Sequence, residues 1–188
     1  IIHVTEFSSD EYLVMLTNKG YIKKTVLTAF SNIRTNGLIA ISLEEGDQLR
    51  WVRLSRVDDS IIIGSSLGRS IHFRVNHEQL RPLGRATRGV RAMSLRDGDS
   101  LVGMAILPGQ IVADVAQAQA EEPDEDESAV DENAELPPQS GPWALVVTTG
   151  GYGKRVPVKQ FRLQNRAGMG IVVTKFRKPG DTLSALHI

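Results

Sequence analysis

Lysine and arginine residues recur at three places in this sequence, each time in a strand-forming run and the loop that follows it. The three sets are Lys19, Lys23, Lys24 and Arg34, then Arg69, Arg74, Arg81, Arg85, Arg88 and Arg91, and finally Lys154, Arg155, Lys159, Arg162 and Arg166. Such cations bind phosphate groups, and a row of them matches the evenly spaced phosphates of a nucleic-acid duplex. No stretch resembles a recognition helix or a zinc finger, so we expect contacts to the backbone rather than reading of bases.

A solvated sheet edge is the competing interpretation, because lysines on exposed strands prevent pairing with other sheets. For a single set the two interpretations are equally supported. Recurrence favours phosphate binding, because a radial array of sheets places equivalent loops along one rim as a basic stripe.

Other chemistry has little support in the residue types present. The chain has no cysteine, which excludes disulfides and thiolate metal sites. Its four histidines have no partner histidine at metal-ligand spacing. The adjacent carboxylates Glu44-Glu45 and Asp58-Asp59 fall in expected turns, where neighbouring side chains point apart. We therefore expect no catalytic residue, no metal and no cofactor.

No apolar run reaches the roughly eighteen residues of a membrane helix. The first residues do not resemble a signal peptide. These features indicate a soluble cytoplasmic protein with no membrane partner.

The elements that would position the cations repeat three times. The repeated sequences are TNGLIAISLEEGDQL (35–49), TRGVRAMSLRDGDSL (87–101) and GMGIVVTKFRKPGDTL (168–183). Each combines a glycine, a strand-forming run and a Gly-Asp turn. Gly46 and Gly98, in the first two turns, lie 52 residues apart. A period near fifty residues is typical of a propeller-like array of sheets.

Each repeat unit is expected to form a blade of four antiparallel strands arranged as two hairpins. The predicted blades span residues 12–54, 60–106 and 143–188. In the first, the strand-forming runs are residues 12–17, 21–27, 38–43 and 48–54. The runs are short and β-branched, which favours strands over helices. Residues 1–7 are interpreted as the last strand of a preceding blade, so the sequence is expected to open inside a longer protein.

Residues 108–142 interrupt the repeats and differ from them in charge. The whole chain has a net charge of zero, but Asp114–Glu135 carries ten acidic residues, and no Lys or Arg occurs between Arg96 and Lys154. Without that segment the repeats hold 22 basic and 12 acidic residues. A short helix is conceivable at 111–120, but the acidic, aromatic-poor composition predicts a disordered insertion. One hypothesis is that it folds back over the basic rim; a solvated spacer is the alternative.

The stretches YLVMLTNKGYIKKTVLTAFSNIRTNGLIAISLEEGDQL (12–49) and RPLGRATRGVRAMSLRDGD (81–99) resemble the C-terminal domain of the DNA gyrase A subunit. The resemblance covers the chain outside residues 108–142; the related subunit of topoisomerase IV is similar but less regular. It implies a β-pinwheel, a propeller variant whose blades exchange a strand. It also implies that a basic rim wraps duplex DNA, while the active-site tyrosine and the ATPase lie elsewhere in gyrase A and gyrase B.

The chain departs from this family in two ways. It contains fewer blades than the family usually has, and it lacks the signature heptapeptide QRRGGKG. Residues 164–170, QNRAGMG, resemble a degenerate copy that keeps Gln164, Arg166, Gly168 and Gly170. The true heptapeptide is expected upstream.

The sequence therefore predicts an all-β β-pinwheel or propeller-like array with an acidic disordered insertion. The expected function is to bind, bend and wrap double-stranded DNA without sequence preference, supporting negative supercoiling by a bacterial-type, nucleoid-associated gyrase holoenzyme. The alternatives are the DNA-binding domain of topoisomerase IV and a propeller-type protein-interaction module whose basic loops only increase solubility.

Overall fold

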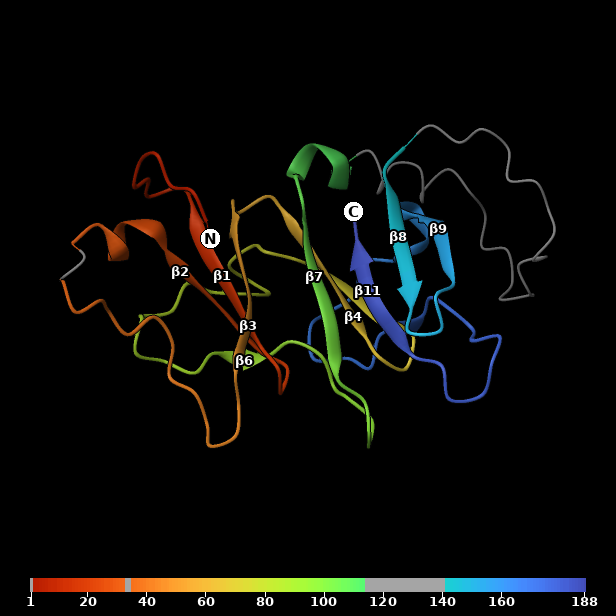
Figure 1. Cartoon of the computed structure of the whole chain (residues 1–188). Coiled ribbons are helices and arrows are strands. Elements are labelled where there is room, and N and C mark those ends of the chain that lie inside the picture. Colours follow the sequence, from red (N-terminus) through yellow and green to blue (C-terminus); the bar gives the residue numbers. More distant parts are fainter. Residues whose placement is uncertain (1, 33–34, 114–140) are drawn as a thin grey trace.

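The computed structural model describes residues 2–32, 35–113 and 141–188 and shows an all-β fold (Figure 1). The strands are β1 (Tyr12–Thr17), β2 (Tyr21–Val26), β3 (Leu49–Ser55), β4 (Ser60–Ser65), β5 (Arg69–Arg74), β6 (Val90–Arg91), β7 (Leu101–Leu107), β8 (Trp143–Thr148), β9 (Gly153–Pro157), β10 (Ile171–Val172) and β11 (Leu183–His187). Two 3₁₀ turns, η1 (Leu27–Phe30) and η2 (Val158–Gln160), and a helical turn at 109–113 complete the described elements. The all-β prediction is confirmed.

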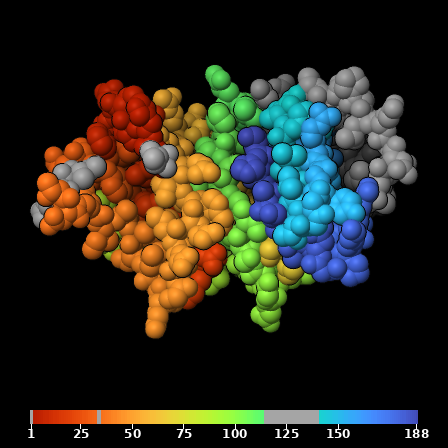
Figure 2. All heavy atoms as spheres, viewed as in Figure 1, coloured from red at the N-terminus to blue at the C-terminus, as the bar shows by residue number. Residues whose placement is uncertain are grey.

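The strands form three antiparallel sheets that follow one another along the chain. Their strand orders are β3-β1-β2-β6, β10-β5-β4-β7 and β11-β8-β9. Figure 2 shows the corresponding repeat units side by side, with unit one (residues 12–54) at the left, unit two (60–106) in the middle and unit three (143–188) at the right. Residues 114–140 of the predicted insertion (108–142) lie outside the described residues, whereas residues 108–113 and 141–142 are described and include the helical turn at 109–113.

Neighbouring units are joined by exchange of a strand. In unit two, β6 leaves its own sheet and pairs with β2 of unit one, with Ile22 opposite Val90. In unit three, β10 pairs in the same way with β5 of unit two, with Ser70 opposite Ile171. The second strand of a hairpin thus receives the third run of the following unit, which is the strand exchange that the family resemblance implied.

This exchange corrects the prediction of two hairpins in each unit. The first hairpins, β1-β2, β4-β5 and β8-β9, are confirmed. The second hairpins are wrong, because the strands on either side of a Gly-Asp turn lie in different sheets, as β6 and β7 do. The Gly-Asp turn therefore carries the chain from the preceding unit's sheet back to its own.

Two predicted strands are not formed. Residues 38–43 have no strand structure, and neither do residues 2–7. β6 and β10 each pair with the second strand of the preceding unit, and the described residues include no unit before β1 with which residues 38–43 could pair. An isolated run cannot satisfy its backbone groups by pairing, so its β-propensity alone does not make it a strand.

The hydrophobic core lies between neighbouring sheets. One cluster joins units one and two, with Ile22, Phe73 and Met93 fully buried. A second joins units two and three and includes Ile62 and Val146. Because each inter-sheet layer draws side chains from two units, no unit buries its apolar surface alone.

Each Gly-Asp turn is tied to the hairpin turn of its own unit by its aspartate. In all three units the Oδ1 atom accepts hydrogen bonds from backbone N–H groups on both turns. The donors are Lys19 (3.0 Å) and Gln48 (2.8 Å) for Asp47, Leu67 (2.9 Å) and Ser100 (2.9 Å) for Asp99, and Gly150 (2.8 Å) and Thr182 (2.8 Å) for Asp181. This contact explains why the Gly-Asp pair recurs.

The aspartate contact predicts acid sensitivity through Asp181. Hydrogen bonds from the hydroxyl of Thr148, then Thr149 and two backbone amides, lower the pKa of Asp181 from 3.8 to about 2. Because the folded-state pKa is below the unfolded one, this stabilisation is present above pH 4 and is lost as the pH falls from about 4 to 2. Asp181→Asn should lower stability at neutral pH and flatten that part of the profile, measured by urea unfolding at several pH values. Asp97→Asn replaces an exposed aspartate on the unit-two turn, is the control for loss of a surface charge, and should lower stability at neutral pH by less than Asp181→Asn.

The exchanged strands also predict a steric test at Gly89. Its φ is +100°, and a Cβ atom would lie 2.4 Å from the carbonyl oxygen of Ile22 on β2. Gly37 has a similar φ of +76° but no atom within 4 Å of a Cβ. Both alanine substitutions incur about 1–2 kcal/mol of backbone strain, and Gly89→Ala should lose roughly a further 1–3 kcal/mol through overlap. Equal losses in chemical denaturation would contradict the close docking of this loop.

Candidate nucleic-acid interface

Several of the predicted cations lie where a loop of one unit crosses the hairpin of the preceding unit. Residues 81–91, which we call the rim loop, run from unit two along β2 of unit one. The equivalent residues 162–172 run from unit three along β5 of unit two. Parallel bridges between Lys24 and Pro82 and between His72 and Leu163 mark the same crossing in both places. The strand exchange therefore positions the cations of one unit beside those of its neighbour.

The rim loop carries four arginines and no acidic residue. Arg81, Arg88 and Arg91 are exposed, and Arg85 is half-buried. The Arg88 guanidinium lies 4.4 Å from the centre of the Tyr21 ring, and that of Arg91 lies 5.5 Å from the same ring. Tyr21 therefore serves as a shared platform that orders two cations at the surface.

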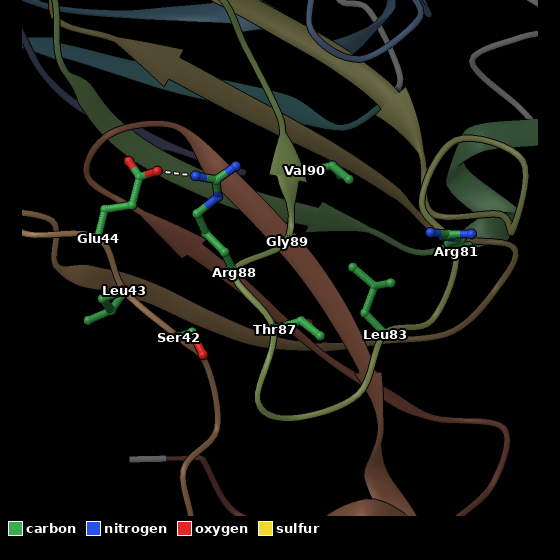
Figure 3. Close-up of a pocket in the computed structure, with 9 residues that line it drawn as sticks. All are labelled: Ser42, Leu43, Glu44, Arg81, Leu83, Thr87, Arg88, Gly89 and Val90. Atoms are coloured by element: carbon green, nitrogen blue, oxygen red, sulfur yellow. Dashed lines mark hydrogen bonds and ion pairs between the residues drawn. The ribbon is translucent and has the colours of Figure 1, made fainter.

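An acidic side chain of unit one contacts this cluster. Glu44 forms an ion pair with Arg88, and Figure 3 shows the two side chains directed at each other. Both are partly exposed, with 40% and 46% of their side-chain surfaces accessible. The pair lies at the edge of an open hollow of about 550 Å³, which is also lined by Ser42, Arg81 and Thr87.

Lys23 and Lys24, which the sequence predicts as phosphate contacts, are both buried, with 0% of each residue exposed. The Lys23 ammonium donates hydrogen bonds to the carbonyl oxygens of Gly84 (2.9 Å), Arg85 (2.5 Å) and Thr87 (3.2 Å). The buried Lys23 side chain thus binds the main chain of the rim loop and helps to position the arginines of that loop.

Lys24 has a similar structural role. Its ammonium donates to the carbonyl oxygen of Val75 and lies 4.6 Å from the centre of the Tyr12 ring. Burial lowers the pKa of both Lys23 and Lys24 to about 8. They therefore remain mostly protonated at neutral pH, as their donor roles require.

The loop that resembles the heptapeptide is engaged in docking unit three onto unit two. The backbone N–H of Gln164 donates to the carbonyl oxygen of His72 (2.7 Å). The Arg166 side chain donates through Nε to the carbonyl oxygen of Gln79 (2.6 Å) and through Nη1 to that of Arg91 (3.2 Å). Gly170 has a φ of +68°, and a Cβ there would lie 2.3 Å from the carbonyl oxygen of Ser70. Gly168 accepts a backbone hydrogen bond from Ser94 (2.9 Å). These contacts account for the retained residues by structure alone.

His72 is buried and belongs to the same docking contact. Its Nδ1 lies 2.7 Å from Phe161 O, and its Nε2 lies 2.7 Å from Ser60 Oγ. Burial lowers the pKa of His72, with a further contribution from Arg74. Arg69 also contacts the unit-three loop, donating to Met169 O (2.9 Å) and Gly170 O (2.6 Å).

Two of the three exposed rim-loop arginines, Arg88 and Arg91, have no basic counterpart in unit three, whereas Arg162 occupies the position of Arg81. Met169 and Val172 occupy the unit-three positions of Arg88 and Arg91, and they are 51% and 56% exposed. The stripe expected from recurrence is therefore uneven, with its strongest basic cluster on unit two.

The remaining predicted cations lie elsewhere along the hairpins. Lys19 is exposed and donates to Glu45 O (2.6 Å). Further exposed cations are Arg74 on β5, Lys154 and Arg155 on β9, and Arg162, whereas Lys159 is half-buried. Arg34 lies outside the described residues. The cations predicted from the sequence did not include Arg177 and Lys178. Arg177 Cζ and Lys178 Nζ lie 5.8 and 5.4 Å from the centre of the Tyr152 ring.

Neither a metal site nor a membrane span is found among the described residues. Within residues 2–32, 35–113 and 141–188, no group of three or more acidic, histidine or cysteine side chains is placed to hold a metal ion. Over the same ranges, no helix is long and apolar enough to cross a membrane.

The geometry predicts that Lys23 positions the rim loop. Lys23→Met should leave three loop carbonyls without their charged donor and cost about 1–3 kcal/mol of stability. Amide hydrogen exchange at residues 84–88 should accelerate more than in β8 and β9. Lys19→Met removes the same charge from an exposed site and is the control. If exchange at 84–88 were unchanged in Lys23→Met, the positioning role would be wrong.

Comparison with known proteins agrees with this architecture. The profile of the family described as "DNA gyrase C-terminal domain, beta-propeller" matches residues 11–56, 59–108 and 142–188. The chain is 56% identical over 192 residues to the DNA gyrase A subunit of Synechocystis sp., covering 100% of the chain and 22% of that protein. It is 39% identical over 188 residues to the chloroplastic/mitochondrial DNA gyrase A subunit of Arabidopsis thaliana, covering 100% of the chain and 18% of that protein. The chain thus spans about a fifth of the length of these relatives.

Solved structures show the same fold at low sequence identity. The C-terminal domain of a DNA topoisomerase IV superposes with a TM-score of 0.72 at 20% identity, covering 98% of this chain and 48% of that one. The C-terminal domain of ParC from E. coli superposes with a TM-score of 0.61 at 16% identity, covering 96% of this chain and 61% of that one. Since the family profile matches most of the sequence and the strand-exchanged sheets agree with it, the chain belongs to the DNA gyrase C-terminal domain family.

Proposed function

We propose that this chain binds duplex DNA through the rim, without sequence preference, and bends it. The observation that carries the proposal is the rim loop, where four arginines lie at a crossing of two units and one of them, Arg88, pairs with the carboxylate of Glu44. Guanidinium groups bind phosphate oxygens through paired hydrogen bonds, and such contacts carry no base information.

Bending follows from the arrangement of the units. Smoothly bending a short DNA site costs several kcal/mol. We infer that exposed cations on successive units, namely Lys19 on unit one, the rim-loop arginines on unit two, and Lys154 and Arg155 on unit three, contact phosphates and offset that cost. We propose that the segments 12–54, 60–106 and 143–188 are the blades that present these contacts.

We further propose that the parent protein is the A subunit of a gyrase rather than its counterpart in topoisomerase IV, because the 56% identity to a gyrase protein extends over the whole chain. In that setting the chain would hold or wrap the DNA segment, and strand cleavage and ATP hydrolysis would belong to other parts of gyrase A and to gyrase B. Curved DNA held on one rim would then favour supercoils of one sign.

A protein-binding role is the second candidate, and one observation favours it. Met169 and Val172 are more than half exposed at rim positions that are arginines in unit two. Apolar side chains at such a surface are typical of protein contacts. Salt dependence of DNA binding separates the two functions, because only phosphate neutralisation makes affinity fall steeply with salt.

The proposal predicts which cations set that salt dependence. Replacing Arg81, Arg88 and Arg91 together by alanine should weaken binding to a labelled duplex and reduce the slope of log K against log salt by roughly 2–3. Fluorescence anisotropy across a salt series measures both quantities.

A matched control removes the same charge from the opposite edge of the same sheet. Arg50, Arg53 and Arg56 are exposed on β3 or just after it, and β3 and β6 are the two edge strands of that sheet. Their triple alanine variant should keep most of the slope. Equal slopes of log K against log salt in the two variants would mean that DNA affinity depends on the net charge of the chain and not on the rim-loop arginines.

A further inference from the structure

The ion pair between Glu44 and Arg88 connects two units at the point where the rim is most basic. Glu44 belongs to the Gly-Asp turn of unit one, and Arg88 belongs to the rim loop of unit two. The backbone brings them together, because the Ser42 amide donates to the carbonyl oxygen of Thr87 (3.1 Å). The equivalent amide of Ser94 donates to Gly168 O (2.9 Å) between units two and three. The close approach is therefore a repeated feature, whereas the ion pair is not.

The residues at the equivalent positions show why the pair is specific to this crossing. In the repeated sequence, Glu44 aligns with Arg96 and Arg177, and Arg88 aligns with Met169. The crossing of units two and three thus places an arginine and a methionine where units one and two place an acid and an arginine. Glu44 therefore supplies the carboxylate that pairs with Arg88 of the rim loop.

Arg88 contacts both Tyr21 and Glu44 and remains accessible to solvent. Its Cζ atom lies 4.4 Å from the centre of the Tyr21 ring, and its Nη1 atom pairs with Glu44, another residue that lines the hollow (Figure 3). Nearly half of the side chain is accessible, so an anion from solvent can approach it. A planar guanidinium donates hydrogen bonds to a carboxylate or to a phosphate in the same geometry.

The charge around this contact favours an additional anion. Arg81, Arg85 and Arg91 lie on the same loop as Arg88, and Glu44 is the carboxylate that pairs with the cluster. Arg88 and Arg91 also share one aromatic ring and repel each other there. Exposed ion pairs contribute little to stability, so the Glu44 contact can be replaced at small cost.

We propose that the hollow between units one and two is a phosphate-exchange site, in which a backbone phosphate of bound duplex DNA displaces Glu44 from Arg88. This inference rests on the proposed DNA-binding function and assigns a role within it. In the free protein, Glu44 holds Arg88 over Tyr21 and partly neutralises it. In the complex, Arg88 contacts phosphate and the Glu44 carboxylate returns to solvent, so Glu44 limits the affinity of the rim.

The test compares two substitutions that change the net charge equally. Glu44→Gln removes the competing carboxylate, and Glu45→Gln removes the neighbouring one, whose side chain makes no ion pair within the described residues. Binding of the whole 188-residue chain to a labelled duplex is measured across a salt series. Glu44→Gln should raise affinity several-fold above Glu45→Gln and give a steeper dependence on salt, because Arg88 no longer exchanges one anion for another.

A second pair of variants assigns the effect to Arg88. In an Arg88→Ala background, Glu44→Gln and Glu45→Gln should have equal affinity. The Nε–H resonance of Arg88, followed by NMR, should shift on Glu44→Gln and on adding duplex to the unsubstituted chain.

The outcomes separate this inference from the function on which it rests. Salt-dependent binding of the unsubstituted chain with equal effects of Glu44→Gln and Glu45→Gln would overturn the exchange and leave DNA binding intact. Absence of salt-dependent binding in the unsubstituted chain would overturn both.

Discussion

The structure depends on one constraint: the third run of each repeat unit must find its pairing partner in the sheet of the unit before it. β6 completes the sheet of β2, and β10 completes that of β5. Where the described residues offer no such partner, as for residues 38–43, the run does not form a strand. The exchange also carries the preceding loop onto the neighbouring hairpin, so the rim is built by pairs of units. A basic loop that is anchored at both ends presents its arginines with little loss of freedom on binding, which favours affinity.

The burial of two lysines is a second feature on which the structure depends. A strand that is covered on both faces is normally apolar, yet Lys23 and Lys24 of β2 are fully buried. Their ammonium groups satisfy carbonyl oxygens of the segments that cross β2, including the rim loop. At the next crossing His72 has this role, with Phe161 and Ser60 as its contacts. The crossings thus share one backbone geometry but use different polar side chains to fix it.

Much of the fold was predictable from local signals. The short β-branched runs of each unit predicted its first hairpin, and the Gly-Asp repeat predicted the array. Pairing across units could not be derived from spacing, because β6 has only two residues and its partner is nearly seventy positions away in the sequence. The surroundings of the candidate site residues were less predictable from the sequence. An alternating or charged pattern does not reveal whether a following loop covers a strand, so Lys23 and Lys24 were placed at the surface. The ion pair of Glu44 with Arg88 also required the crossing to be known.

Duplex DNA is expected to lie along the rim loop and not along the opposite edge of the sheet. Arginine-selective chemical modification with mass-spectrometric readout, in the presence and absence of a short duplex, tests this placement residue by residue. We expect DNA to protect Arg81, Arg88 and Arg91 while Arg50 and Arg53 on β3 remain equally reactive. Protection of the β3 arginines with an unprotected rim loop, or uniform protection of all five, would contradict binding at the rim.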